Sequence, residues 1–189
     1  MKAAILGGTF NPVHYGHLFV AETIRSELGY EKIILVPANK PVHKDDTPVI
    51  DPVDRLAMLR LAVEGNPHFV VDDCDIRRGG KTYSIETVTH LVSAYDISGK
   101  PGFIIGDDLV AGFVSWKEAE RLARETDLIV VRRTSEKPLP FAFPHRFVTN
   151  AILPISSSEI RKRVVEGGSV RYLLPDAVIA YIEAHRLYV

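Results

Sequence analysis

The 189 residues include 23 basic and 24 acidic side chains, which leaves a formal net charge of -1. This balance gives no overall field that would attract nucleic acid or an anionic membrane, so any phosphate binding must be local. With 46% hydrophobic residues the chain can bury one sizeable core, and we expect residues 1–189 to form a single domain.

The cysteine content and the apolar runs bear on the compartment. Cys74 is the single cysteine, which excludes an internal disulfide and cannot by itself support a zinc site. No apolar stretch approaches the roughly 20 residues that span a bilayer. The first apolar run, residues 3–6, turns at Gly7 too early to form the core of a signal peptide. We therefore expect a cytoplasmic protein.

Apolar runs and amphipathic segments alternate from the first residues onward. Residues 2–6 and 32–36 predict buried strands, and residues 15–28 and 52–63 have apolar side chains at helical spacing. Further strands are predicted near 69–73, 102–105, 128–131 and, more weakly, 147–150, and further helices over 84–94, 116–124, 155–166 and 175–185. Pro175 is suited to the first turn of the last helix.

This alternation predicts an α/β fold: a doubly wound, Rossmann-like parallel sheet with helices on both faces and a C-terminal helical segment. In such folds the ligand crevice lies at the carboxyl ends of the strands. Two segments are predicted to be the least ordered, residues 40–47 and residues 135–143, the latter broken by Pro138 and Pro140.

Glycines and histidines occupy the turn between the first strand and the first helix, where folds of this kind bind phosphate. Gly7 and Gly8 permit close backbone approach, and His14 and His17 lie three residues apart, so both can face one side of the first helical turn. The segment lacks the Gly-Lys-Ser/Thr of a Walker loop and the G-x-G-x-x-G of a dinucleotide site.

Here the sequence resembles the nucleotidyltransferases that carry a G-x-F-x-P-x-H-x-G-H motif. All of the fixed positions match, as Gly8, Phe10, Pro12, His14, Gly16 and His17. A second segment supports the resemblance: residues 155–161, Ile-Ser-Ser-Ser-Glu-Ile-Arg, are similar to the I-S-S-T/S-x-I-R segment that binds the ATP phosphates in that superfamily. By itself the second segment also fits a capped helix with a basic face, because Glu159 follows Ser156 by three residues.

The two motifs together imply transfer of AMP from ATP but leave the acceptor open. The acceptors known in the superfamily include pantetheine phosphate and nicotinate or nicotinamide mononucleotide. Residues 40–44, 81–87 and 105–109, and Trp116, resemble in order the bacterial nicotinate-nucleotide adenylyltransferase family. Two positions depart from its pattern: Asn11 stands where Asp is usual, and Thr82-Tyr83-Ser84 inverts the common Ser/Thr order.

The resemblance implies a role for each matching residue. The implied catalytic residues are His14, His17, Lys44 and Arg161. The implied ATP-binding residues are Gly8, Thr9, Phe10, His17, Gly106, Asp108, Ile155, Ser156, Ser157 and Arg161. The nicotinate nucleotide would contact Thr82, Tyr83, Ser84 and Trp116, where an aromatic ring can stack on the pyridine and hydroxyls can receive its carboxylate. Taken singly, Trp116 and Tyr83 also fit core aromatics.

Mg²⁺ is expected with ATP, held by phosphate oxygens and water, since no carboxylate cage lies near either motif and no protein metal ligand is predicted. Asp72, Asp73 and Asp75 are interpreted as a solvated edge, and Cys74 as a structural residue. The expected partners are the small molecules ATP and nicotinate mononucleotide, without nucleic acid or membrane. The sequence leaves open a homo-oligomer, the preference for acid over amide, and whether residues 40–47 close over substrate. A non-catalytic nucleotide-binding module on the same fold is the alternative from a different class.

Overall fold

The computed structural model describes residues 1–40, 50–133 and 140–189. Six strands in this part of the chain form one parallel sheet in the order β3-β2-β1-β4-β5-β6. Their bounds are β1 Ala3–Gly8, β2 Lys32–Pro37, β3 Phe69–Val71, β4 Gly102–Gly106, β5 Asp127–Val131 and β6 His145–Val148. The direction of winding changes between β1 and β4, so the predicted doubly wound, Rossmann-like fold is confirmed.

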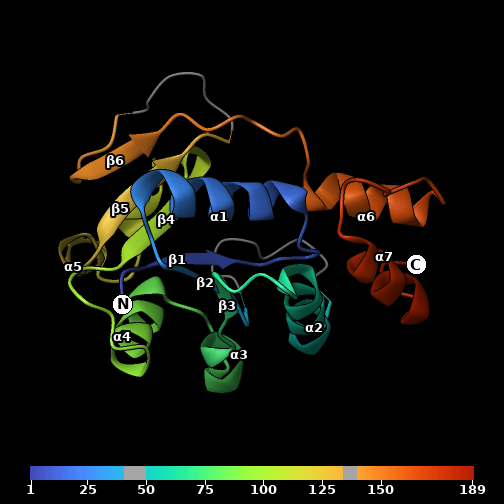
Figure 1. The fold of residues 1–189 in the computed structure, drawn as a ribbon, viewed down its shortest axis with the longest axis horizontal. Coiled ribbons are helices and arrows are strands. Elements are labelled where there is room, and N and C mark those ends of the chain that lie inside the picture. The colour runs from blue at the N-terminus through green and yellow to red at the C-terminus, as the bar shows by residue number, and fades with distance from the viewer. Residues whose placement is uncertain (41–49, 134–139) are drawn as a thin grey trace.

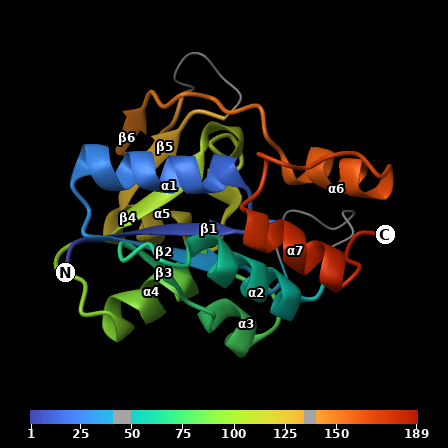
Figure 2. The same cartoon turned by 45° about the vertical axis from the view of Figure 1, so that its right-hand side comes forward.

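Helices cover both faces of the sheet, and α1 and α4 lie on opposite sides of β1 in both views (Figures 1 and 2). The helices are α1 Tyr15–Leu28, α2 Pro52–Val63, α3 Cys74–Arg78, α4 Ser84–Ala94, α5 Ala119–Glu125, α6 Ser157–Val165 and α7 Asp176–Ala184, with short 3₁₀ turns at Asp107–Leu109 and Phe113–Ser115. Of these, α6 and α7 form the predicted C-terminal helical segment, at the end of the molecule opposite the N-terminus (Figure 1).

Alternate residues of each strand enter two separate cores, as expected for a sheet that is buried on both sides. On one face Ala4 and Ile104 pack with residues of α1, α2, α6 and α7. On the other face Ile5 and Phe103 pack with residues of α3, α4 and α5. This two-sided burial explains why the strands are uninterrupted apolar runs in the sequence.

Several predicted element bounds were wrong, and a side-chain hydrogen bond explains one of the differences. The third strand ends at Val71, because the Asp72 carboxylate accepts the Cys74 backbone N–H (2.8 Å) where the unpredicted helix α3 begins. Pro175 lies one residue before α7 rather than in its first turn. The Ser156 hydroxyl accepts the Glu159 N–H (3.2 Å) and so caps α6 as predicted, while the Glu159 carboxylate pairs with Arg163.

The fifth helix also begins later than predicted. Trp116 ends a 3₁₀ turn, and Ala119 opens α5. Within the described residues, no helix is long and apolar enough to cross a membrane.

Candidate active site

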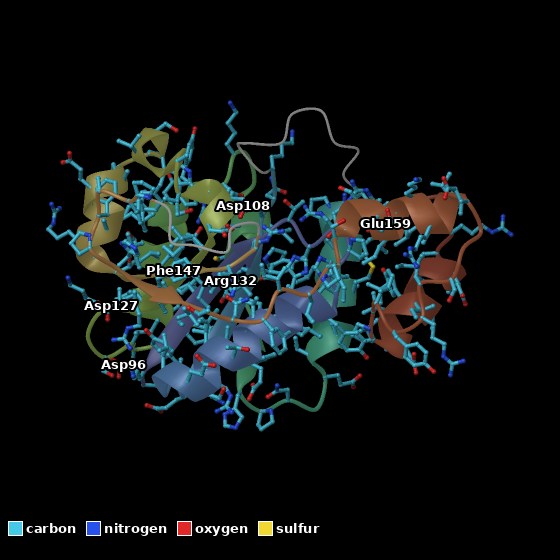
Figure 3. The ribbon with its side chains drawn as sticks, turned by 90° about the horizontal axis from the view of Figure 1, so that it is seen from above. Asp96, Asp108, Asp127, Arg132, Phe147 and Glu159 are labelled. Atoms are coloured by element: carbon cyan, nitrogen blue, oxygen red, sulfur yellow. The ribbon has the colours of Figure 1, made fainter. Side chains whose placement is uncertain are left out.

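A cavity of about 1090 Å³ opens at the carboxyl ends of the strands, and it gathers the predicted site residues from the whole length of the chain. Its lining includes Gly8, Thr9, Phe10, His14, His17, Thr82, Tyr83, Ser84, Gly106, Asp108, Trp116, Ile155, Ser156, Ser157 and Arg161. Figure 3 places Asp127 at the start of β5 and Arg132 just past its end, on the side facing Glu159 of α6. The remaining predicted residue, Lys44, lies outside the described residues.

The two histidines of the first motif pack against each other at the start of α1, with ring centroids 3.7 Å apart. The His14 backbone N–H donates to Nδ1 of His17 (3.2 Å). Because Nδ1 accepts, the proton of the neutral His17 ring lies on Nε2. Gly16 makes room for this pair, since a Cβ there would lie 2.9 Å from Nδ1 of His14. The spacing of the motif thus sets the tautomer and the position of His17.

His14 is a buried, neutral residue. Its side chain is 3% exposed, and Nδ1 has no hydrogen-bond partner among the residues that the structure describes. Burial, together with the positive charge of Arg133, lowers the pKa of His14 to about 4. The imidazole therefore carries no positive charge at pH 7, and any contribution to a phosphate site comes from a neutral ring.

The second motif is hydrogen-bonded to the loop of the first, although almost the whole chain separates them. Nη1 of Arg161 donates to the Asn11 carbonyl (2.8 Å), and Nη2 donates to the Ser158 hydroxyl (3.2 Å). The Ser157 hydroxyl donates to the Pro12 carbonyl (2.9 Å), and the Asn11–Pro12 peptide bond is cis. These contacts place the amino end of α6 beside that of α1, where both helix dipoles favour an anion.

Two of the residues predicted to bind ATP lie at the carboxyl end of β4: Gly106 is its last residue, and Asp108 follows it. Asp107 is buried, and its carboxylate accepts the Arg133 backbone N–H (3.0 Å). The Asp108 carboxylate pairs with the guanidinium of Arg133 (3.3 Å). Asp108 and Arg133 both line the cavity, so the ends of β4 and β5 are connected at its wall.

Hydroxyls and aromatic rings line another part of the cavity, formed by the start of α4 and the segment before α5. The Thr82 hydroxyl oxygen accepts the Asn39 backbone N–H (3.0 Å). The ammonium of Lys117 lies 4.4 Å from the centre of the Tyr83 ring. Trp116 packs on Phe113, with centroids 5.0 Å apart, and is only partly buried. Trp116 was predicted to be either a core aromatic or a contact for the nicotinate nucleotide. In the structure it packs against the core and also lines the cavity.

The interpretation of the aspartates after the third strand as a solvated edge was wrong for Asp72 and Asp75. Asp72 is 8% exposed and Asp75 is 2% exposed, and hydrogen bonds from Tyr95 to Asp72 (2.8 Å) and from Thr87 to Asp75 (2.6 Å) compensate for the lost hydration. Asp75 also forms an ion pair with Arg78 and lines the cavity. Cys74 is buried, and burial raises the pKa of its thiol. Asp72 and Asp75 are therefore buried polar side chains, although the sequence pattern predicts that they are exposed to solvent.

One group of potential metal ligands does lie near these aspartates. Asp72, Cys74 and His90 each place one ligand atom within 4.8 Å of the others. Arg77 and Arg78 line a separate, smaller cavity with Cys74 and His90, and their positive charge opposes a cation there.

Sequence reasoning missed two residues that hold the first motif in place. Arg55 of α2 is fully buried, and its Nη1 donates to the Thr9 carbonyl (2.7 Å). The Tyr188 hydroxyl donates to the side-chain oxygen of Asn11 (3.0 Å). A fully buried arginine within an amphipathic helix has no local signal in the sequence, since its acceptors are backbone carbonyls of distant segments.

The parallel sheet, the paired histidines and the two helix ends at one cavity define a nucleotidyltransferase class of fold and site. Comparison with known proteins supports this class, because the sequence model of the cytidylyltransferase-like family matches residues 5–163. The chain belongs to this family and, within it, to the nicotinate-nucleotide adenylyltransferases, which confirms the resemblance found in the sequence.

Two curated relatives carry the name "probable nicotinate-nucleotide adenylyltransferase". The protein from Borrelia hermsii is 44% identical over 189 residues, covering 100% of this chain and 98% of the relative. The protein from Lactiplantibacillus plantarum is 37% identical over 187 residues, covering 99% of this chain and 88% of the relative. These alignments span the site residues on both sides of the cavity.

The fold is similar to a solved structure of Plasmodium falciparum nicotinic acid mononucleotide adenylyltransferase complexed with NaAD. The TM-score is 0.81 at 21% identity, over 99% of this chain and 97% of that one. The same enzyme complexed with APC gives a TM-score of 0.78 at 20% identity, over 99% and 96% of the two chains. At 20–21% identity, these two structural similarities support the fold alone.

Proposed function

We propose that this protein transfers the AMP part of ATP to nicotinate mononucleotide, which yields nicotinate adenine dinucleotide and pyrophosphate in NAD biosynthesis. One observation carries the proposal: Arg161 and Ser157 are hydrogen-bonded to the loop that precedes His14 and His17. A cavity that has two helix amino ends at one part of its wall, and hydroxyls with aromatic rings at another, suits a polyphosphate beside a pyridine ring.

The reaction is a direct in-line displacement without a covalent enzyme intermediate. An oxygen of the acceptor's 5′-phosphate forms a bond to the α-phosphorus of ATP, and the bond from that phosphorus to the bridging oxygen breaks. Pyrophosphate leaves with the bonding electrons. Because the acceptor phosphate is already anionic, the protein's part is to align the two substrates and stabilise the negative charge on the transferring group.

Each site residue is assigned its own part in alignment and charge stabilisation. Nε2–H of His17 is the donor that we assign to the transferring phosphoryl group, because its ring tautomer is set by the His14 backbone. Arg161 supplies positive charge beside the amino end of α6, and backbone amides of Gly8 and Thr9 add further donors. His14 contributes as a neutral ring. Lys44 is assigned to the phosphates by its place in the sequence motif.

Mg²⁺ would accompany the polyphosphate, held by phosphate oxygens and water. The carboxylates among the described cavity-lining residues fit this arrangement, since Asp75 pairs with Arg78 and Asp108 pairs with Arg133. When bound, the ion would neutralise charge on the leaving pyrophosphate. The protein's own part is to hold the rest of the triphosphate through Ser156, Ser157 and Arg161.

Three broader expectations belong to the same proposal. Residues 1–189 act as one domain, which is supported by two cores that share one sheet. The protein works in the cytoplasm on small-molecule substrates. The two departures from the family pattern retain the relevant polar groups. Asn11 has a side-chain oxygen that accepts from Tyr188, and Thr82 and Ser84 both have hydroxyls.

The test is pyrophosphate release from ATP and Mg²⁺ with nicotinate mononucleotide, nicotinamide mononucleotide or phosphopantetheine offered separately. We expect release with nicotinate mononucleotide. Release with only one of the other two acceptors would retain the transfer chemistry and refute the assigned acceptor. Silence with all three, together with tight ATP binding, would favour a non-catalytic nucleotide-binding module.

A further inference from the structure

Arg55 is a buried cation that is solvated by backbone carbonyls. Its side chain has no exposed surface, and its three donating nitrogens face three separate segments. Nη1 donates to the Thr9 carbonyl (2.7 Å), Nη2 donates to the Asn39 carbonyl (3.0 Å), and Nε donates to the Ile50 carbonyl (3.3 Å). Burying a charged group costs several kcal/mol unless it is fully hydrogen-bonded, so these contacts hold the three segments firmly.

Two of these segments lead to different parts of the cavity. Thr9 lies in the first motif, beside Gly8 and ahead of the two histidines. Asn39 follows β2, and its backbone N–H donates to the Thr82 hydroxyl oxygen (3.0 Å), while its side-chain amide donates to the Gly80 carbonyl (2.9 Å). The Arg55 fork therefore joins Thr9 to Thr82 through a single intermediate residue.

We propose that Arg55 is a positioning residue that fixes the ATP-facing loop at Thr9 relative to the acceptor-facing segment at Thr82. This inference rests on the proposed function and adds a residue that touches neither substrate. In-line transfer requires the attacking and leaving oxygens to be aligned on opposite sides of the α-phosphorus, so a small shift between the two parts lowers turnover more than binding. The planar guanidinium suits this role, because its fixed donors reach two carbonyls at once.

Removal of the Arg55 fork should lower kcat more than it changes KM. Arg55→Met keeps the apolar length of the side chain and removes the fork, and we expect kcat to fall by roughly 10- to 100-fold, as for small misplacements of reacting groups. KM for ATP and for nicotinate mononucleotide should each change much less, since each part of the cavity keeps its own contacts. The measurement is steady-state pyrophosphate release, corrected for the folded fraction.

Met58→Ala is the matched control for lost packing. Met58 lies one turn further along α2, is fully buried in the core, and lines neither the cavity nor the fork. The Met58→Ala variant should be less stable to heat than the wild-type protein, and its kcat per folded molecule should equal that of the wild type. Equal kcat in Arg55→Met and Met58→Ala would overturn the proposal, because Arg55 would then be a packing residue only.

Hydrogen exchange tests the proposal without any substrate, so it stands apart from the choice of acceptor. In Arg55→Met the amides of residues 8–11 and of residues 80–83 should both lose protection, while Met58→Ala should retain it at both. Unchanged protection at either segment would contradict the positioning role. If wild-type protein is inactive with every acceptor, the proposed function fails while this measurement still decides the role of Arg55. If Arg55→Met does not fold, Arg55→Lys, which keeps the charge and lacks the fork, is judged by the same criteria.

Discussion

At the scale of single residues, the structure separates two histidines that look equivalent in the sequence. His14 is buried and its pKa is lowered to about 4, whereas His17 accepts a backbone N–H through Nδ1 and keeps a proton on Nε2. In the proposed function, His14 contributes as a neutral ring and His17 is the residue to which we assign the donor role. Each role has its own measurable consequence.

His14 should make the protein sensitive to acid. The unfolded chain takes up the proton near pH 6.5 and the folded protein only near pH 4, so the folded state binds fewer protons between these values. Stability from this group is therefore complete above pH 6.5 and falls as the pH drops to about 4, by roughly 3 kcal/mol in all. Denaturant unfolding across this window should show the loss. His14→Gln should flatten this part of the profile, and an unchanged slope would assign it to other groups.

His17 should be required for turnover. His17→Ala should lower kcat by about 10² to 10³, the usual cost of removing one transition-state donor. His17→Asn is the informative partner, because its side-chain oxygen can still accept the His14 N–H while the Nε2 donor is lost. We expect both variants to be slow and the Asn variant to keep more stability. Normal pyrophosphate release by a folded His17→Asn protein would remove His17 from the mechanism.

At the scale of elements, α6 brings Ser157 and Arg161 to the cavity wall. Its amino end is held by Ser156 within the helix and by Ser157 and Arg161 against the loop ahead of α1. The helix is thereby positioned by hydrogen bonds to its first turn, while Ile160 provides its buried contact. Changes in this turn should affect ATP before they affect the acceptor.

Arg161→Ala should weaken ATP binding by roughly 10- to 100-fold, because charge-assisted hydrogen bonds contribute about 1.5–3 kcal/mol each. Arg163→Ala is the control from the same helix, since Arg163 is half-exposed and pairs with Glu159. Its removal should leave ATP affinity within about twofold of wild type. Calorimetric titration with ATP measures both, and equal affinity for the two variants would refute the role of Arg161.

Some parts of the fold and site were predictable from the sequence, and others were not. Apolar periodicity located α1, β1 and β2, and the motif spacing located His14, His17 and Arg161, because these signals are local in the chain. The environments of Arg55 and Asp75 were not predictable in this way. Arg55 has acceptors up to 46 residues away, and Asp75 is buried by Thr87 from another helix. Polar residues of this kind look like surface residues until the tertiary contacts are known.

At the scale of the whole molecule, Tyr188 connects the last described segment to the first motif. Its side chain is partly buried, the loss of hydration raises the pKa of its hydroxyl, and that hydroxyl donates to Asn11. The residue that departs from the family pattern is thus held from the far end of the chain. The contact couples the packing beyond α7 to the loop that carries the site.

Tyr188→Phe should therefore destabilise the fold by about 1 kcal/mol, the usual net value of one hydrogen bond, or roughly 2–4 °C in Tm for a chain of this size. Tyr172→Phe is the matched control, since Tyr172 is 77% exposed and should have no measurable effect. Thermal unfolding followed by circular dichroism compares them. Equal melting temperatures for both variants would show that the Tyr188 hydroxyl adds nothing to stability.

The hydrogen bonds from Arg161 and Ser157 to residues 11 and 12 also have a consequence for biosynthesis. They span 150 and 145 residues, so the loop at residues 11 and 12 cannot acquire these partners until Arg161 and Ser157 have emerged from the ribosome. A nascent chain that already displays the glycine- and histidine-rich turn would have an incomplete phosphate site. Tight nucleotide binding should therefore arise only after residue 161 has been synthesised.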